Sequence, residues 1–292
     1  MKVLVTGSQG QLARSLAERA AAHPGLDLIL AGRPEVDLET AGSATAVILA
    51  AQPDVVINAA AYTAVDQAED EPDRAFRINA AGAEEVAAAA AEVGAGVVQI
   101  STDYVFDGQS AEPYDEAAPV NPLGVYGRSK LAGEVAVRSA NAKHIIIRTA
   151  WVYSPFGRNF LKSIMAAATQ RDILTVVDDQ HGSPTSALDL ADGLIAMLAK
   201  GEGWGSTYHL AGSGSASWCE FAAAITNVCA EIGLPAAKVQ PISTEDWPTR
   251  AVRPRNSVLD CSKFKRDFGF VMPDWRGAAE QTIRRLARAD PS

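Results

Sequence analysis

A glycine-containing turn directly after the first apolar run is the feature that most limits how this chain can fold. Val3-Leu4-Val5 leads into Gly7-Ser8-Gln9-Gly10 and then into residues 11–22, which are rich in Ala, Leu, Arg and Glu. This order predicts a strand, a tight turn and a helix. Gly7 can make the turn and Gly10 lets a pyrophosphate approach the backbone, while the first amide groups of the helix favour phosphate. A plain β-turn before a helix is the alternative, and the position after the first strand favours the nucleotide interpretation.

The alternation of strand and helix continues through the first half of the chain. Strand-like apolar segments are expected at 28–31, 55–58, 96–100 and 144–148, and a long Ala- and Glu-rich helix is expected over 74–93. Parallel strands joined by helices form a sheet that is covered on both faces. The predicted fold class is therefore α/β: a Rossmann-like doubly wound parallel sheet with a smaller C-terminal α/β substrate lobe.

The regular alternation loosens after Gly157, which suggests a division into two parts. We expect residues 1–170 to form an NAD(P)-binding Rossmann domain that returns at about 186–212. Residues 171–185 and 213–292 are expected to form the smaller lobe. The elements expected in this half of the chain are helices over 159–169, 188–198, 218–232 and 274–287 and strands over 174–177 and 207–210.

Charge and composition argue against several classes of protein. The net charge of −9 is unlike that of a nucleic-acid-binding protein, which usually carries a basic face. Hydrophobic residues make up 48% of the 292 residues, which is enough for a large core. The three cysteines form no C-x-x-C pair, and no signal segment or membrane-spanning stretch is evident. We therefore expect a cytoplasmic protein that does not associate with a membrane.

Tyr126 and Lys130 are the main candidates for acid/base chemistry. A spacing of four residues on an expected helix puts the phenol and the ammonium on one face. A phenol titrates at about pH 10, so it exchanges protons readily at neutral pH only if a nearby cation lowers its pKa. Lys130 can supply that cation. Two surface residues on an amphipathic helix are the alternative, and the segments around the pair decide between the two.

Polar and aromatic side chains follow two of the expected strands. Thr102 and Asp103 come after the strand at 96–100, at the edge where open α/β sheets bind ligands. A hydroxyl there can hydrogen-bond a substrate carbonyl, although Thr also serves as a strand cap. Trp151 follows the strand at 144–148 and either forms a wall of the same pocket or belongs to the core. Residues 104–124 are rich in turn formers and are expected to be a substrate-facing loop.

The end of the strand expected at 28–31 bears on the choice of cofactor. An acid there would bind the 2′-hydroxyl of the adenosine ribose, but the strand ends at Gly32-Arg33. Arg33 can bind a 2′-phosphate, which favours NADPH over NADH, and a solvated loop charge is the alternative. Asp37 and Leu38 can border the adenine. The small residues that lead to Tyr62 and Thr63 can let a cofactor pass close to the backbone.

Two further polar residues receive lesser roles. Asn79 can reach the helix of Tyr126 from the helix expected over 74–93, and we expect it to act in support. His181 has no second His or acid at ligand spacing, so it is expected to form loop hydrogen bonds. No residue is assigned as a metal ligand.

Seven segments together resemble the extended short-chain dehydrogenase/reductase superfamily and, within it, the dTDP-4-dehydrorhamnose reductase family. The resemblance covers almost the whole chain. The Ser-Thr-Asp, Trp151 and Asp-Gln-x-Gly segments mark the narrower family. The seven segments are Thr6-Gly7-Ser8-Gln9-Gly10-Gln11-Leu12, Asn58-Ala59-Ala60-Ala61-Tyr62-Thr63-Ala64-Val65-Asp66, Ser101-Thr102-Asp103-Tyr104-Val105-Phe106, Val125-Tyr126-Gly127-Arg128-Ser129-Lys130-Leu131, Arg148-Thr149-Ala150-Trp151-Val152-Tyr153, Asp179-Gln180-His181-Gly182-Ser183-Pro184-Thr185 and Arg253-Pro254-Arg255-Asn256-Ser257.

The resemblance implies NADPH-dependent reduction of the C4 keto group of dTDP-4-dehydro-L-rhamnose to dTDP-L-rhamnose, the last step of dTDP-L-rhamnose synthesis. Tyr126 would donate the proton, Lys130 would lower the pKa of Tyr126 and bind the nicotinamide ribose, and Thr102 would hydrogen-bond the carbonyl. The residues expected at the cofactor are Gly7, Gly10, Gln11, Leu12, Arg33, Asp37, Leu38, Ala61, Tyr62, Thr63, Tyr126 and Lys130. The residues expected at the nucleotide-sugar substrate, which the smaller lobe would bind, are Thr102, Asp103, Tyr126 and Trp151.

The sequence departs from the family pattern and leaves alternatives open. Ala13 stands where the glycine motif has its third glycine, and its small size permits the same packing. Some family members form a magnesium-linked dimer through acids that are not identifiable here, so Mg²⁺ and a homodimer stay open. The alternatives in function are another nucleotide-deoxysugar reductase or epimerase, or a non-catalytic nucleotide-binding regulatory subunit. The intact Thr102, Tyr126 and Lys130 favour an enzyme.

Overall fold

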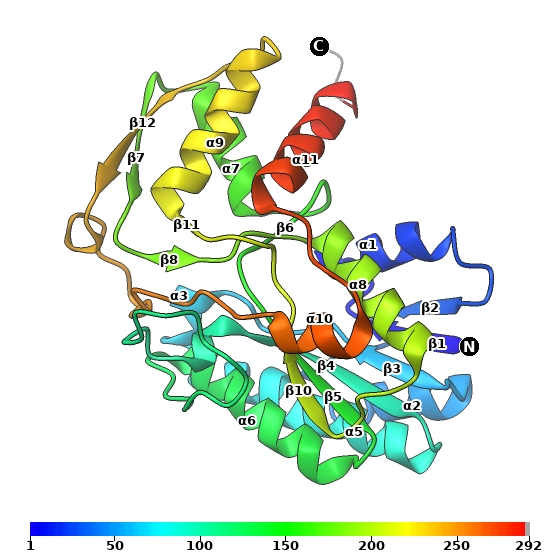
Figure 1. The fold of residues 1–292 in the computed structure, drawn as a ribbon. Helices are drawn as coiled ribbons and strands as arrows, with labels where there is room; N and C mark the ends of the chain where they lie inside the picture. Colours follow the sequence, from blue (N-terminus) through cyan, green and yellow to red (C-terminus); the bar gives the residue numbers. More distant parts are fainter. Residues whose placement is uncertain (290–292) are drawn as a thin grey trace.

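A six-stranded parallel sheet forms the centre of the larger part of the molecule (Figure 1). The structure is a computed structural model that describes residues 1–289. The strands lie in the order β10-β5-β4-β3-β1-β2, so the direction of the winding reverses beside β1. Their bounds are Lys2–Thr6 for β1, Asp27–Ala31 for β2, Val55–Asn58 for β3, Gly96–Thr102 for β4, His144–Thr149 for β5 and Ser206–His209 for β10. Ligands bind such sheets at the carboxyl ends of the strands, at the reversal.

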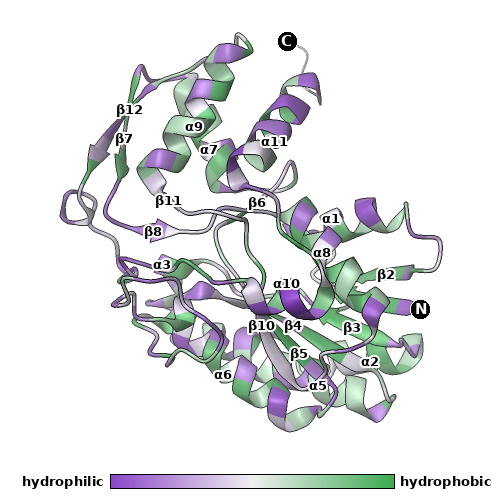
Figure 2. Ribbon diagram, in the orientation of Figure 1, coloured by the Kyte–Doolittle hydropathy of each residue, from purple (hydrophilic) through white to green (hydrophobic). Residues whose placement is uncertain are grey.

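Helices cover both faces of this sheet, as the class of fold predicted from the sequence requires. On one face, α1 and α8 pack on the sheet together with the aromatic residues of α10. On the other face, α2, α5 and α6 pack on it. Figure 2 shows that the central strands are mostly hydrophobic, as expected for strands buried on both faces. The bounds are Gln11–Ala20 for α1, Ser43–Ala51 for α2, Gly82–Glu92 for α5, Val125–Ala140 for α6, Ala187–Lys200 for α8 and Ser262–Phe268 for α10.

A polar ladder crosses three of the central strands at or near their carboxyl ends. The Thr6 hydroxyl donates to the Asn58 side-chain oxygen at 2.6 Å, and the Asn58 amide donates to Gln99 at 2.8 Å. Thr6 Oγ1 also accepts the backbone N–H of Ala60 at 3.1 Å. These buried groups satisfy one another, so they fix how β1, β3 and β4 align at the edge where a ligand would lie.

The smaller lobe has its own core, and it is built around three helices and a two-stranded parallel sheet (Figure 1). The helices are α7 (Phe160–Ala168), α9 (Trp218–Glu231) and α11 (Trp275–Ala289), and β7 (Ile173–Val177) pairs with β12 (Lys238–Ile242). The sequence placed α7 with the larger domain, but its apolar face packs on α9. It placed α10 in the lobe, but Phe264 and Phe268 pack in the core of the main sheet. We propose that the first boundary lies near Trp151 and not at residue 170.

Short elements join the two parts. The two-residue strands β6 and β9 pair with each other, and so do β8 and β11. Other short elements include α3 and the 3-10 turns η2 and η3. Their bounds are Val152–Tyr153 for β6, His181–Gly182 for β8, Thr185–Ser186 for β9, Ala216–Ser217 for β11, Val65–Ala68 for α3, Asp103–Val105 for η2 and Thr244–Asp246 for η3.

The long helix expected over 74–93 is not a single α-helix. It consists of α4 (Pro72–Phe76), a π-helical turn η1 (Arg77–Ala81) and then α5. A π turn holds one residue more than an α turn and is frequent at functional sites. Here it contains Asn79, which is 2% exposed. Of the helices within residues 1–289, none is both long and apolar enough to cross a membrane.

Candidate active site

A cleft of about 850 Å³ lies between the carboxyl edge of the sheet and the smaller lobe. It extends from the turn after β1 to Trp218 at the start of α9. Every residue that the sequence placed at the cofactor or the substrate lines this one cleft. These residues are Gly7, Gly10, Gln11, Leu12, Arg33, Asp37, Leu38, Ala61, Tyr62, Thr63, Thr102, Asp103, Tyr126, Lys130 and Trp151.

The turn after β1 has the geometry of a phosphate-binding loop. Gly7 has φ +77°, a conformation that favours glycine, and a Cβ there would lie 3.1 Å from the backbone of Ala60. Helix α1 begins after Gly10 with no side-chain cap and no acid in its first turn. Its first amide groups therefore stay available to an anion. The Gln11 side chain is engaged elsewhere, because it donates to the Val152 carbonyl at 3.2 Å and accepts from Ser154 and Asn159.

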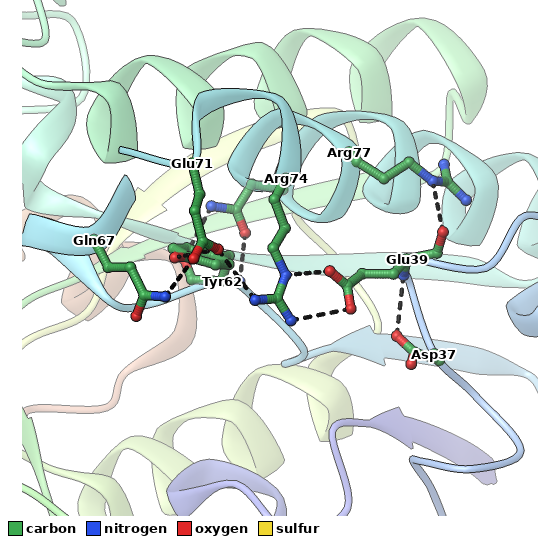
Figure 3. A network of polar contacts seen from close by, with 8 residues as sticks. Asp37, Glu39, Tyr62, Gln67, Glu71, Arg74 and Arg77 are labelled. Atoms are coloured by element: carbon green, nitrogen blue, oxygen red, sulfur yellow. Dashed lines mark hydrogen bonds and ion pairs between the residues drawn. The ribbon is translucent and has the colours of Figure 1, made fainter. Parts of the chain in front are cut away.

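Arg33 lies at the end of the cleft where β2 stops. Its side chain is exposed and forms no ion pair with another residue in the range 1–289. Of the acids that follow it, Glu35 forms no ion pair within this range, Asp37 accepts the backbone N–H of Glu39 at 3.1 Å, and Glu39 pairs with Arg74 (Figure 3). Arg33 is therefore a cation without a bound carboxylate at the mouth of the cleft.

A network around Tyr62 holds the next part of the cleft wall. The Tyr62 hydroxyl donates to Glu71 at 3.1 Å, and Arg74 bridges Glu71 and Glu39 (Figure 3). Asn79 grips the backbone of the same residue: its oxygen accepts the Tyr62 N–H at 2.8 Å and its amide donates to the Tyr62 carbonyl at 3.0 Å. The amide also donates to Ser129 Oγ at 2.9 Å. Asn79 thus ties the 61–63 segment to α6, which is the supporting role expected for it.

Tyr126 and Lys130 both lie on the first turns of α6 and face the cleft. The helix comes very close to its neighbours, because a Cβ at Gly127 would lie 2.2 Å from the Tyr104 carbonyl and one at Gly133 would lie 2.0 Å from that of Asn79. The ring of Tyr104 packs edge-on against Tyr126 at 5.8 Å. Glycine at these two positions lets the helix bring its acid/base pair up to the end of β4.

The electrostatics of the pair differ from expectation. Burial raises the pKa of Tyr126 to about 12, the Thr102 hydroxyl lowers it in part, and the Asp103 charge raises it further. Lys130 is not among the groups that shift this pKa, so the predicted lowering by Lys130 is wrong for this structure. The reason is geometric: the Lys130 ammonium donates to the carbonyl of Ile100 at 2.6 Å. Burial lowers the pKa of Lys130 itself to about 8.

Thr102 and Asp103 lie next to the pair at the end of β4. The Thr102 hydroxyl donates to Asp103 Oδ1 at 3.0 Å and accepts the backbone N–H of Tyr104 at 3.2 Å. Asp103 is 2% exposed, and this burial raises the pKa of its carboxyl to about 6. Both side chains line the cleft.

A buried ion pair that was not predicted anchors α6 to β5. Glu134 accepts from Arg148 at 2.9 and 2.8 Å and from the Ser101 hydroxyl at 2.6 Å. The hydrogen bonds and charge of Arg148 hold the pKa of Glu134 below its usual range, although burial alone would raise it. Nothing in the local sequence pairs residues 134 and 148, so only the register of α6 on the sheet reveals the contact.

Trp151 lines the cleft, as one of its two predicted alternatives required, and it does so in an unusual conformation. Its φ of +45° is rare for a bulky residue. Its indole is stacked on Trp218, with ring centroids 3.4 Å apart and planes within 5°. The sequence singled out helix 218–232 but not Trp218 as a site residue, because 67 positions separate the two rings in the chain.

Two of the motif segments meet at the side of the cleft. Arg253 forms an ion pair with Asp66 on α3, with Nη2 2.7 Å from Oδ2. The Asp66 carboxylate also accepts the backbone N–H of Ala251 at 3.1 Å. His181 takes part in backbone bonds, donating its N–H to the Arg255 carbonyl at 2.8 Å. Across residues 1–289 no group of His, Cys, Asp or Glu side chains is placed to hold a metal ion.

Comparison with known proteins assigns the chain to a family. The model of the RmlD substrate binding domain family matches residues 1–288. The chain belongs to this family. It is 45% identical to the dTDP-4-dehydrorhamnose reductase of Sinorhizobium fredii over 99% of this chain and 97% of that protein.

Solved structures agree with this family assignment. The dTDP-4-dehydrorhamnose reductase of Clostridium acetobutylicum superposes with a TM-score of 0.91 at 39% identity, over 98% of this chain and 99% of that one. The enzyme of Bacillus anthracis, solved in complex with NADP, gives a TM-score of 0.90 at 38% identity, over 97% and 99% of the two chains. The predicted α/β fold with a Rossmann-like doubly wound parallel sheet is therefore confirmed.

Proposed function

We propose that this chain uses NADPH to reduce the C4 keto group of dTDP-4-dehydro-L-rhamnose to dTDP-L-rhamnose, the last step of dTDP-L-rhamnose biosynthesis. The observation that carries the proposal is the convergence of Tyr126, Lys130 and Thr102 at one end of a cleft whose other end is the glycine turn after β1. Full-length similarity to dTDP-4-dehydrorhamnose reductases supports the choice of reaction.

The residues that line the cleft fit a nicotinamide dinucleotide. The Gly7 turn and the uncapped start of α1 would hold the pyrophosphate, and the 61–63 segment would lie along the rest of the cofactor. Arg33 would bind a 2′-phosphate, which favours NADPH over NADH. When bound, the cofactor supplies the hydride. Magnesium is not part of the proposal, and a homodimer stays a prediction.

The chain's own groups would then handle the proton and the developing charge. The buried Tyr126 phenol stays protonated at neutral pH, so it can donate to the C4 oxygen as that oxygen gains charge. Thr102 would hydrogen-bond the same oxygen, in exchange for its bond to Asp103. Lys130 is held by the carbonyl of Ile100. It would bind the nicotinamide ribose and supply a positive charge there.

The test is an assay of purified chain with NADPH and freshly prepared dTDP-4-dehydro-L-rhamnose. We expect one NADPH oxidised for each dTDP-L-rhamnose formed. Oxidation of NADPH only with a different 4-keto deoxysugar nucleotide would mean that the chain is a reductase of that other substrate. Isomerisation of a sugar nucleotide without net NADPH consumption would replace it with an epimerase, and binding of NADPH without turnover on any such substrate would replace it with a regulatory role.

A further inference from the structure

Trp151 keeps its unusual backbone conformation because two neighbouring residues hold its indole in place. One is the stack on Trp218, with centroids 3.4 Å apart. The other is Gly182 on β8, where a Cβ would lie 2.4 Å from Trp151 Cε2 and 2.6 Å from Nε1. The main chain is also fixed, since the Trp151 carbonyl accepts the N–H of Thr185 at 3.2 Å. A residue at φ +45° persists only where its surroundings determine it in this way.

The stack lies at the reacting end of the cleft. Thr149 at the end of β5 is in register with Thr102 on β4, and Trp151 follows Thr149 by two residues. Trp151 and Trp218 both line the cleft and are both only half-buried, so part of each indole remains accessible there. Trp218 is also held by Phe160, whose ring centroid is 4.6 Å away. The lobe thus presents a rigid aromatic surface beside the hydroxyl and phenol groups of the main sheet.

We propose that Trp218 is a positioning residue, which together with Gly182 holds the Trp151 indole so that its accessible edge contacts the apolar CH groups of the sugar ring. The inference deepens the proposed function and rests on it. An indole makes apolar contacts at little cost in conformational entropy when its own orientation is already fixed. The residues assigned to the dinucleotide follow β1 and β2 or lie in the 61–63 segment and on α6, and neither Trp151 nor Trp218 is among them.

The test separates sugar binding from cofactor binding and from folding. We expect Trp218→Ala to raise the KM for the sugar nucleotide about tenfold, while the Kd of NADPH stays within about twofold. Trp218→Phe keeps a ring on Trp151 and should restore most of the lost affinity. Gly182→Ala disturbs Trp151 from its other side and should raise the same KM. Trp247, which is 57% exposed on a loop, provides the matched control, and Trp247→Ala should leave the KM unchanged.

A double variant shows whether Trp218 acts through Trp151. If it does, Trp151→Ala with Trp218→Ala should have the KM of Trp151→Ala alone, because the second change removes nothing further. Additive effects of the two changes would overturn the positioning role. So would an unchanged KM in Trp218→Ala, or a loss of NADPH affinity as large as the loss of sugar affinity. If the unsubstituted chain itself does not turn over the substrate, the proposed function fails first and the inference with it.

Discussion

The ammonium group of Lys130 lies 2.6 Å from the carbonyl oxygen of Ile100, so the lysine of α6 is bonded to the strand that delivers Thr102. This bond, and not a contact with the Tyr126 phenol, fixes the ammonium. Burial lowers the pKa of Lys130 to about 8, against the opposing influence of Glu134. Lys130 is therefore charged at neutral pH and loses its charge as the pH rises through about 8.

The titration of Lys130 should limit activity on the alkaline side. We expect the reductive kcat/KM to fall above about pH 8, because the neutral amine no longer supplies a positive charge beside the proposed ribose site. Lys130→Met should have low activity and lack this alkaline limb in a profile of kcat/KM against pH. A wild-type profile that stays level to about pH 10 would contradict the assignment.

Removal of the phenol hydroxyl should affect the reaction and not the binding of cofactor. We expect Tyr126→Phe to lose a factor of about 10² to 10⁴ in kcat, the usual contribution of a general acid. The NADPH Kd, measured by fluorescence titration, should change little, since the Phe ring keeps the edge-on contact with Tyr104. Comparable turnover by this variant would mean that another group donates the proton.

Arg33 should decide between the two nicotinamide cofactors. Its guanidinium has no carboxylate partner within residues 1–289, so a 2′-phosphate would gain a charge-assisted bond at no cost in broken ion pairs. We expect Arg33→Ala to weaken NADPH about tenfold and NADH less than about twofold. The measurement is the Kd of each cofactor with both proteins. An unchanged preference would show that the charge is only solvated.

Asp103 should make the stability of the fold depend on pH. Burial raises the pKa of its carboxyl from 3.8 to about 6, so the folded state favours the protonated form. The ionised form costs roughly 3 kcal/mol of folding free energy above pH 6, and this cost disappears as the pH falls toward 4. Asp103→Asn should therefore stabilise the chain at about pH 8 and lose that advantage at about pH 4.

Denaturant unfolding at the two pH values measures the difference between Asp103→Asn and the unsubstituted chain. Asp172→Asn, at an exposed position, is the matched control and should leave the unfolding free energy unchanged at both pH values. If the two variants changed the unfolding free energy equally little at about pH 8, Asp103 would ionise in the folded state at little cost.

Removal of one partner of the Glu134–Arg148 ion pair should strongly lower the free energy of unfolding. Both side chains are buried, so Glu134→Ala leaves an uncompensated guanidinium, and we expect a loss of about 3 to 5 kcal/mol in unfolding free energy. The exposed pair of Glu18 and Arg285 gives the comparison, and Glu18→Ala should cost less than about 1 kcal/mol. Equal costs for the two substitutions would mean that water reaches Arg148.

The sequence predicted the parts of this molecule that depend on local patterns. The strands of the main sheet and the Gly7 turn follow from apolar runs and from a glycine at a position with φ +77°. The π turn at 77–81 was missed because its residues are those of an ordinary helix. Strand β12 was missed because Pro241 interrupts its pattern, which a strand paired on one side tolerates.

Contacts between distant segments were beyond the reach of the sequence pattern. The stack of Trp151 on Trp218 and the pairing of Glu134 with Arg148 depend on how the lobe and α6 pack, not on spacing along the chain. The direction of the Lys130 side chain also depends on packing between distant segments. Four-residue spacing placed it on the face of Tyr126, but the carbonyl of Ile100 determined where its ammonium lies.

The π turn that contains Asn79 also constrains how the length of this chain can change. Deletion of one residue between Arg77 and Ala81 would convert the π turn into a regular α turn and leave the helices on either side in nearly the same relative orientation. The turn would then lack the extra residue that brings Asn79 against Tyr62, although α5 could keep its place on the sheet. Single-residue gaps at this point in an alignment would therefore mark chains that hold the cofactor segment by other means.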